Sequence, residues 1–171
     1  MFKAMGMIMV FLSGILFSFL KADELKQKYE NLKEIKKALF LLKNDISFSS
    51  KDLPLAIEEI SHALSGGMRD FFAVLSDKLK GDEKITFKDA WEMSFKEYKK
   101  PFLPKDAEKI VASFSSDIGK LSKNAEIENI EKTINELEAE LIKESENYKK
   151  NRQLILTLGM GVCVTTLILF M

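Results

Sequence analysis

AEIENIEKTINELEAELIKESENYKKNRQLILTLGMGVCVTTLILFM, residues 125–171, is the stretch that decides the fold. Its first half places apolar residues at alternating three- and four-residue spacing, with Glu, Lys and Asn between them: Ile127, Ile130, Ile134, Leu137 and Leu141. This spacing is typical of a helix that buries one apolar seam. No glycine or proline interrupts the chain between Lys120 and Leu158, so we expect one long helix.

The same helix continues into an apolar segment. Lys149, Lys150 and Arg152 precede residues 154–171, which contain no charged residue. Roughly 18 helical residues at about 1.5 Å each give about 27 Å, close to the hydrocarbon thickness of a bilayer. We therefore predict a transmembrane helix over 154–171.

The start of the chain shows the same three features in reverse order: a charge-free segment, then basic residues, then a helix with an apolar seam. Residues 4–20 carry no charge, which predicts a first transmembrane helix within residues 1–20. The alternative is a signal peptide, but Phe19, Leu20 and Lys21 occupy the junction where small residues should precede a cleavage site. An apolar stripe at heptad-like spacing follows, made of Leu25, Leu32, Ile35, Leu39, Leu42 and Ile46. We expect the first and last helices to run antiparallel and to pack along their seams.

Charge defines the central domain and its orientation. The chain has 171 residues with 26 basic and 26 acidic side chains, and all the acidic ones fall within residues 21–153. This balance excludes the basic footprint of a nucleic-acid-binding protein. Basic residues flank the inner end of both apolar segments, whereas Lys3 stands alone outside them. The positive-inside bias therefore predicts a cell-membrane protein with a cytoplasmic domain at 21–153 and with both termini across the membrane.

Four shorter helices are expected between the two long ones, at about 53–64, 68–80, 87–98 and 106–118. Asp52 or Ser50 can cap the first, Thr86 can cap the third, and Gly119 can stop the fourth. In the fourth, the predicted inward residues are Ile110, Phe114 and Ile118. No stretch has the period-two pattern of a strand. The predicted fold is all-α: two transmembrane helices flanking a six-helix cytoplasmic bundle.

The residues offer little chemistry. The only histidine is His62, and the only cysteine, Cys163, lies in the second apolar segment, so neither a zinc site nor a Cys–His or Ser–His–Asp set is available. The glutamates of the last helix, among them Glu126, Glu128 and Glu140, are expected to form a solvated face. We expect no enzyme activity and no cofactor. Trp91 is either a core residue or an exposed partner anchor.

Small residues in the apolar segments are candidates for helix packing. Gly14 with Ser18, and Gly159 with Cys163, form small-xxx-small pairs that let helix backbones approach closely. We predict that the two spans pack on each other or on partner helices.

Several short stretches, each with its own residues, follow one another in a characteristic order and spacing. They are Ala38-Leu39 to Asp45-Ile46, the aromatic Phe48, Leu53-Pro54 with Ala56, Phe71-Phe72, Asp77-Lys78-Leu79, Ala90-Trp91-Glu92 with Ser94, and Phe114 before Ile118-Gly119. Their order and spacing, together with the Gly-containing first span and the long last helix, resemble the stage III sporulation protein AB family of endospore-forming bacteria. The resemblance covers essentially the whole chain. The family tends to have Glu at Asp45, Pro at Asp52, Gly at Ser115 and Gln near Glu128, so this chain looks like a diverged member.

The resemblance implies a non-enzymatic platform subunit of the channel-like complex between mother cell and forespore. Its implied partners are membrane lipid, a secretion-type ATPase similar to stage III sporulation protein AA, and other stage III sporulation membrane subunits. The family is also similar to the inner-membrane platform proteins of type II secretion and type IV pilus machines. An alternative function is a membrane-anchored signalling adaptor that binds a partner through its helical bundle.

Asp45 and Asp52 are the candidate partner-facing residues. An upright first helix would place Asp45 roughly 37 Å beyond Leu20, so a partner arriving from the cytosol would meet this end of the bundle first. Both carboxylates can instead be structural. Asp52 can cap a helix, and Asp45 can pair with a neighbouring lysine such as Lys43 or Lys51.

Overall fold

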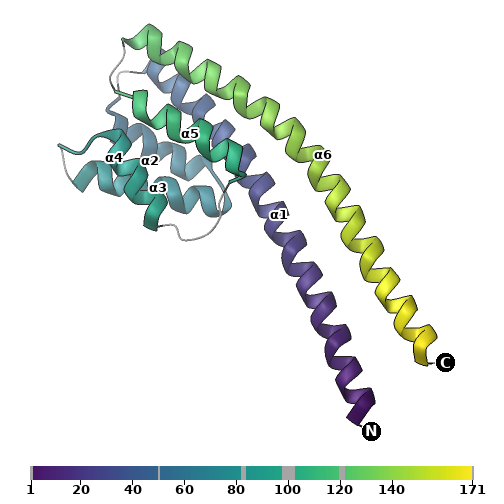
Figure 1. Ribbon diagram of the computed structural model, residues 1–171. Helices are drawn as coiled ribbons and strands as arrows, with labels where there is room; N and C mark the ends of the chain where they lie inside the picture. Colours follow the sequence, from purple (N-terminus) through teal and green to yellow (C-terminus); the bar gives the residue numbers. More distant parts are fainter. Residues whose placement is uncertain (1, 50, 82–83, 98–102, 120–121, 171) are drawn as a thin grey trace. The chain divides into compact units, whose positions relative to one another are not determined.

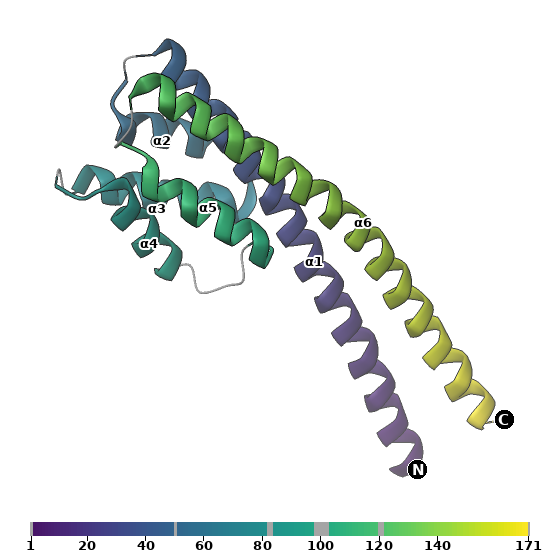
Figure 2. The ribbon, with the colours of Figure 1, turned by 45° about the horizontal axis from the view of Figure 1, so that its top comes forward.

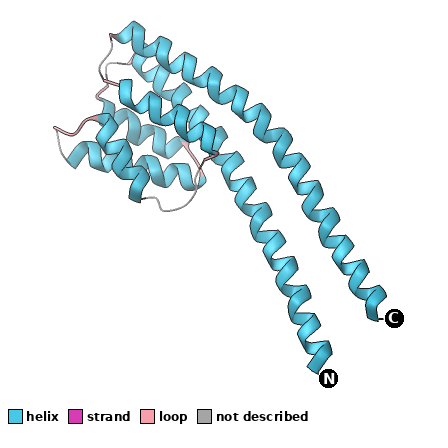
Figure 3. Ribbon diagram, viewed as in Figure 1, coloured by secondary structure: helices cyan, strands magenta, loops and turns pink. Residues whose placement is uncertain are grey.

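The computed structural model describes residues 2–49, 51–81, 84–97, 103–119 and 122–170. Within the helices, the side chains of 2–15, 17–19, 152, 156 and 158–170 are not described. The described residues form six helices: α1 (Phe2–Phe48), α2 (Leu53–Ala63), α3 (Gly66–Gly81), α4 (Phe87–Glu97), α5 (Lys105–Asp117) and α6 (Lys123–Phe170) (Figure 1). They contain no strand (Figure 3), which confirms the all-α prediction.

The chain divides into two compact units. One consists of Lys28–Ile142, and the other consists of the two helix ends, Met1–Gln27 and Lys143–Met171. Within the residues searched, no helix meets the length and apolarity that crossing a bilayer requires. Most side chains of segments 4–20 and 154–171, for which transmembrane helices were predicted, lie outside the described ones.

Inside the Lys28–Ile142 unit, α1 and α6 run antiparallel and side by side, as the two views in Figures 1 and 2 agree. Two ion pairs fix the register. The Nζ atom of Lys36 lies 3.1 Å from Oε2 of Glu138, and Nζ of Lys43 lies 3.1 Å from Oε1 of Glu131. The pairs are one heptad apart on both helices and advance in opposite directions along them. The predicted antiparallel arrangement is confirmed for this unit.

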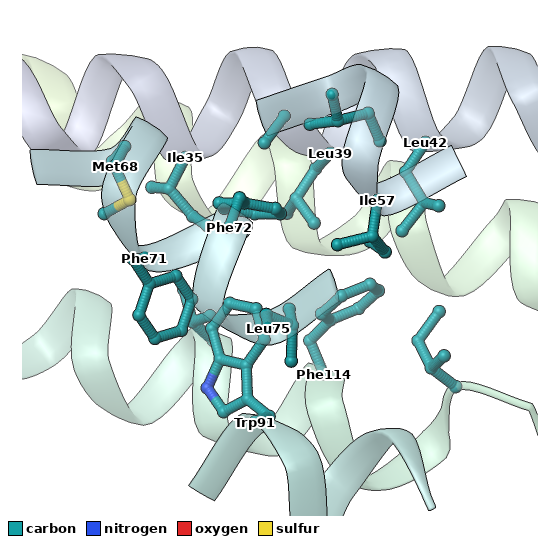
Figure 4. Close-up of a cluster of buried hydrophobic side chains, with 14 of the residues drawn as sticks. Ile35, Leu39, Leu42, Ile57, Met68, Phe71, Phe72, Leu75, Trp91 and Phe114 are labelled. Atoms are coloured by element: carbon teal, nitrogen blue, oxygen red, sulfur yellow. The ribbon is translucent and has the colours of Figure 1, made fainter. Parts of the chain in front are cut away.

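Four of the six predicted seam residues of α1 are buried, and the two outer ones, Leu25 and Ile46, are only partly buried. Leu32, Ile35, Leu39 and Leu42 are almost completely buried, and Ala38 joins them. Figure 4 shows three of these side chains facing α2 and α3, where Ile57, Phe72 and Leu75 complete the contact. A helix buries such a stripe because residues three and four apart share one face.

The seam of α6 is displaced from the predicted one. Ile130 and Leu137 are fully buried as expected, but Thr133 and Glu140 are the other buried positions, while Ile134 and Leu141 are only partly buried. The Thr133 hydroxyl donates to the backbone oxygen of Asn129 at 2.8 Å, which satisfies it inside the helix. The prediction that Glu140 belongs to a solvated face was wrong, since 9% of it is exposed.

Helices α2 to α5 pack beside the 28–48 segment of α1. The α2–α3 turn is held by two α1 side chains: Glu34 accepts a bond from the Ser65 backbone N–H at 2.9 Å, and Lys37 donates to the Ala63 carbonyl at 2.5 Å. Gly66 starts α3 with a φ of 57°, a left-handed conformation that glycine adopts without strain. The helix therefore begins two residues before the predicted Met68.

The caps of α4 and α5 follow the sequence signals. The Thr86 hydroxyl accepts the Asp89 N–H at 3.2 Å and donates to the Asp89 carboxylate at 2.7 Å, as expected for a cap before α4. Gly119 follows α5 with a φ of 79° and confirms the predicted stop. Within α5 the inward residues include Val111 rather than Ile110, which is only partly buried.

The core centres on aromatic rings from α3, α4 and α5. Phe71 meets Phe72, Trp91 and Phe95 edge to face, with centroids 5.6, 4.8 and 6.3 Å apart. Figure 4 shows Trp91 pointing into this cluster between Phe71 and Phe114. Trp91 is 4% exposed, so of the two alternatives raised by the sequence the structure selects the core residue.

Candidate interaction site at the bundle tip

Four chain segments meet at one end of the Lys28–Ile142 unit: the last turns of α1, the first turn of α2, the residues after α5 and the start of α6. They enclose a hollow of about 200 Å³, which we name the tip hollow. Its apolar lining consists of Leu42, Ile46, Leu53, Ala56 and Ile118, and its charged lining consists of Asp45, Lys51 and Glu126, with Gly119 between.

Asp45 lines this hollow from the penultimate turn of α1. Its backbone oxygen accepts the Ser49 N–H at 2.8 Å, and the Ser47 hydroxyl donates to the Lys43 carbonyl at 2.7 Å, so the helix stays regular up to its end. The predicted partner-facing position of Asp45 therefore lies beside a concavity formed by three other elements.

Lys51 is the cation of the tip hollow. Its ammonium group forms an ion pair with the Glu59 carboxylate of α2. The hydrogen bond to Glu59 raises the pKa of Lys51; desolvation opposes it, and the charges of Glu59 and Asp45 add smaller upward effects. The two lysines named as alternative partners of Asp45 form ion pairs with other carboxylates, Lys43 with Glu131 and Lys51 with Glu59.

Glu126 connects the two segments on the other side of the hollow. Its Oε1 accepts the backbone N–H of Gly119 at 2.7 Å. The left-handed φ of Gly119 turns the chain after α5 so that this N–H faces the first turn of α6. Glu126 therefore belongs to the tip hollow and not only to the solvated face for which it was predicted.

Asp52 has a different environment from Asp45. It stands at the N-cap position of α2, where its backbone oxygen accepts the N–H groups of Leu55 and Ala56, both at 3.1 Å. Its side chain makes no cap hydrogen bond, so the predicted capping role is carried by the backbone alone. The carboxylate is exposed and lies outside the lining of the tip hollow.

Phe48 is the functional candidate that the periodicity missed. It is the last residue of α1 and 90% exposed, the largest exposure among the large apolar side chains of the described residues. Its exposure could have been predicted from its position, because it follows Ile46, the last residue of the apolar seam, at the end of an amphipathic helix.

The other predicted positions add no further site. Gly14, Ser18, Gly159 and Cys163 have helical backbone, but their side chains lie outside the described residues. His62 is exposed in the last turn of α2, as expected for a solvated residue.

The tip hollow can bind but offers no catalytic set. Its polar side chains are two carboxylates and an ammonium group, with no hydroxyl or thiol nucleophile beside a base. Among the described residues, no group of three or more His, Cys, Asp or Glu side chains is arranged to hold a metal ion.

Comparison with known proteins identifies the family. The family model described as stage III sporulation protein AB matches residues 3–171. Stage III sporulation protein AB of Bacillus subtilis (strain 168) is 23% identical over 173 residues, which cover all of both chains. A solved structure of stage III sporulation protein AB has the same fold, with a TM-score of 0.66 and 21% identity over 72% of this chain and 97% of that one. Since the family model matches nearly the whole chain, this protein is a member of the stage III sporulation protein AB family.

Proposed function

We propose that this sporulation protein is a non-enzymatic platform subunit of the secretion-like complex between mother cell and forespore, anchored in the inner membrane. Its bundle tip docks a cytoplasmic secretion-type ATPase similar to stage III sporulation protein AA. The observation that carries the proposal is the composition of the tip: a charged hollow without a catalytic set, lined in part by the end of α1, the helix that terminates in the exposed Phe48. Aromatic anchors beside polar groups are typical of protein interfaces.

Two membrane spans, at 4–20 and 154–171, are part of this proposal. Their support is the absence of charge in both segments and the exposure of three leucines, at 64% for Leu16, 64% for Leu20 and 50% for Leu154. Leu16 and Leu20 are four residues apart and share one face of α1, and contiguous apolar surface of this kind is typical of a face that lipid or protein covers. The other stage III sporulation membrane subunits are the proposed partners of Gly14, Ser18, Gly159 and Cys163.

Cysteine labelling tests the orientation. Ser65 and Ser122 are exposed on the Lys28–Ile142 unit, so a membrane-impermeant maleimide should reach a cysteine at either position once it enters the cytoplasm. In a Cys163→Ser background, we expect Ser65→Cys and Ser122→Cys to be labelled only in permeabilised cells. Labelling in intact cells would place the bundle on the opposite side and exclude a cytoplasmic ATPase as its partner.

A charge reversal tests docking at the tip. Asp45→Lys removes one of the two carboxylates of the tip hollow and adds a second cation beside Lys51, so it should abolish co-purification with the ATPase. Because Asp45 is only partly buried, the melting temperature should change by no more than a few degrees.

Asp77→Lys is the matched control, since Asp77 is exposed on α3 and away from the lining of the tip hollow. This variant should retain the ATPase. If Asp45→Lys also retains it, the docking surface lies elsewhere on the bundle, and if Asp45→Lys unfolds the protein, Asp45 is structural.

A further inference from the structure

The size of the tip hollow limits what can occupy it. Pockets for small-molecule ligands usually measure about 300–1,000 Å³, so about 200 Å³ is too small for most metabolites and suits a single side chain. Three contacts also tie its walls together: Lys43 of α1 pairs with Glu131 of α6, Lys51 of the α1–α2 loop pairs with Glu59 of α2, and the Gly119 N–H after α5 donates to Glu126 of α6. Its shape is therefore set by the bundle before any partner arrives.

The lining combines an apolar wall with charge at its edge. Leu42, Ile46 and Ile118 offer aliphatic surface, whereas Asp45 and Glu126 offer carboxylates from two different helices. The Gly119 N–H donates a hydrogen bond to Oε1 of Glu126. The second oxygen of a carboxylate can accept a further hydrogen bond from a ligand. A long side chain with an aliphatic stem and a cationic end matches this pattern, because such side chains bury the stem and keep the charge at the rim.

The charge balance also favours a cation. The lining carries two carboxylates, Asp45 and Glu126, and one ammonium group, that of Lys51, which forms its ion pair with Glu59 outside the lining. Since Glu59 already balances the charge of Lys51, Asp45 and Glu126 leave the hollow with a net negative charge. An anionic ligand would meet repulsion at this rim.

We infer that the tip hollow receives an arginine side chain from a basic segment of the docking partner, with its stem against Ile46 and Ile118 and its guanidinium group between Asp45 and Glu126. Arginine fits better than lysine, because its planar group carries five donors, can serve two carboxylates at once and sheds water more readily. This inference rests on the proposed docking function and names the chemistry of the residue that the tip recognises.

The test uses the full-length chain in detergent micelles, with isotope-labelled isoleucine methyl groups observed by NMR. The probe is N-acetyl-arginine methylamide, and N-acetyl-norleucine methylamide is the uncharged control with a similar stem. We expect saturable shifts at Ile46 and Ile118 with the arginine compound only. The shifts should disappear in Asp45→Asn and in Glu126→Gln, whose amide oxygen can still accept the Gly119 N–H.

Glu128→Gln is the matched control variant, because Glu128 is exposed on α6 and does not line the tip hollow. It should keep the saturable shifts. Absence of shifts in the unmodified chain, equal shifts with norleucine, or shifts that survive Asp45→Asn would each overturn the arginine site. These outcomes are independent of ATPase co-purification, so docking of the ATPase through other residues can stand if the arginine site fails.

Discussion

Leu137→Asp should abolish cooperative unfolding of the Lys28–Ile142 bundle. Leu137 is fully buried between α6 and the rest of the core. A carboxylate there loses its water without gaining a partner, at a cost of several kcal/mol. That cost approaches the whole stability of a small domain, about 5–15 kcal/mol. We expect thermal melts of the full-length chain, followed by circular dichroism, to show no cooperative transition.

Two matched variants on the same helix separate burial from the other effects of an introduced aspartate. Ala139→Asp changes an exposed position and should cost only the helix propensity, below about 1 kcal/mol. Ile134→Asp changes a partly buried position from which a carboxylate can reach water, so it should lower the melting temperature and keep the transition cooperative. Equal behaviour of Leu137→Asp and Ala139→Asp would show that the α6 seam is not part of the core.

Phe71→Ala should destabilise the bundle by about 3–5 kcal/mol, the range for removal of a buried aromatic ring. Phe71 is fully buried and contacts the rings of Phe72, Trp91 and Phe95, so its removal leaves a void and also removes the edge-to-face contact with Trp91 at 4.8 Å. The melting temperature should fall by on the order of 10–20 °C. Circular dichroism should follow the melt, because Trp91 fluorescence itself depends on the ring that is removed.

Phe48→Ala is the control for the loss of an aromatic ring. Phe48 is 90% exposed, so its removal should change the free energy of unfolding by less than about 0.5 kcal/mol. A large loss of stability in Phe48→Ala, or none in Phe71→Ala, would contradict the assignment of these two rings to the surface and the core.

The sequence predicted helix starts and stops correctly where a residue type favours one backbone conformation or one hydrogen bond. Gly119 stops α5 because glycine accepts a positive φ, and Thr86 starts α4 because its hydroxyl satisfies a free N–H group. Such effects involve neighbours a few residues apart, so they can be recognised without the fold. The same reasoning failed for Asp52, whose backbone and not its side chain caps α2.

The seam of α6 shows the limit of periodicity. The apolar stripe predicted Ile134 and Leu141 as buried, but the helix turns its Thr133 and Glu140 side inward next to Ile130 and Leu137. Both stripes share Ile130 and Leu137, and at the other two positions they differ by one residue. Because successive helical residues lie about 100° apart, the centre of the buried face moves by roughly half of that angle. Periodicity defines a broad face, and the packing of that face against the rest of the core decides which of its residues lie at the centre.

The sequence by itself determined the all-α class, the limits of the four shorter helices to within about two residues, the central part of the apolar seam of α1 and the family to which the chain belongs. These properties depend on residue order and on contacts within one helix. Only the tertiary structure decided that Asp45, Lys51 and Glu126 line one hollow, because α1, α2 and α6 bring together residues far apart in the chain. It likewise decided that Trp91 is core and Phe48 is surface, since burial depends on what packs against a helix from elsewhere.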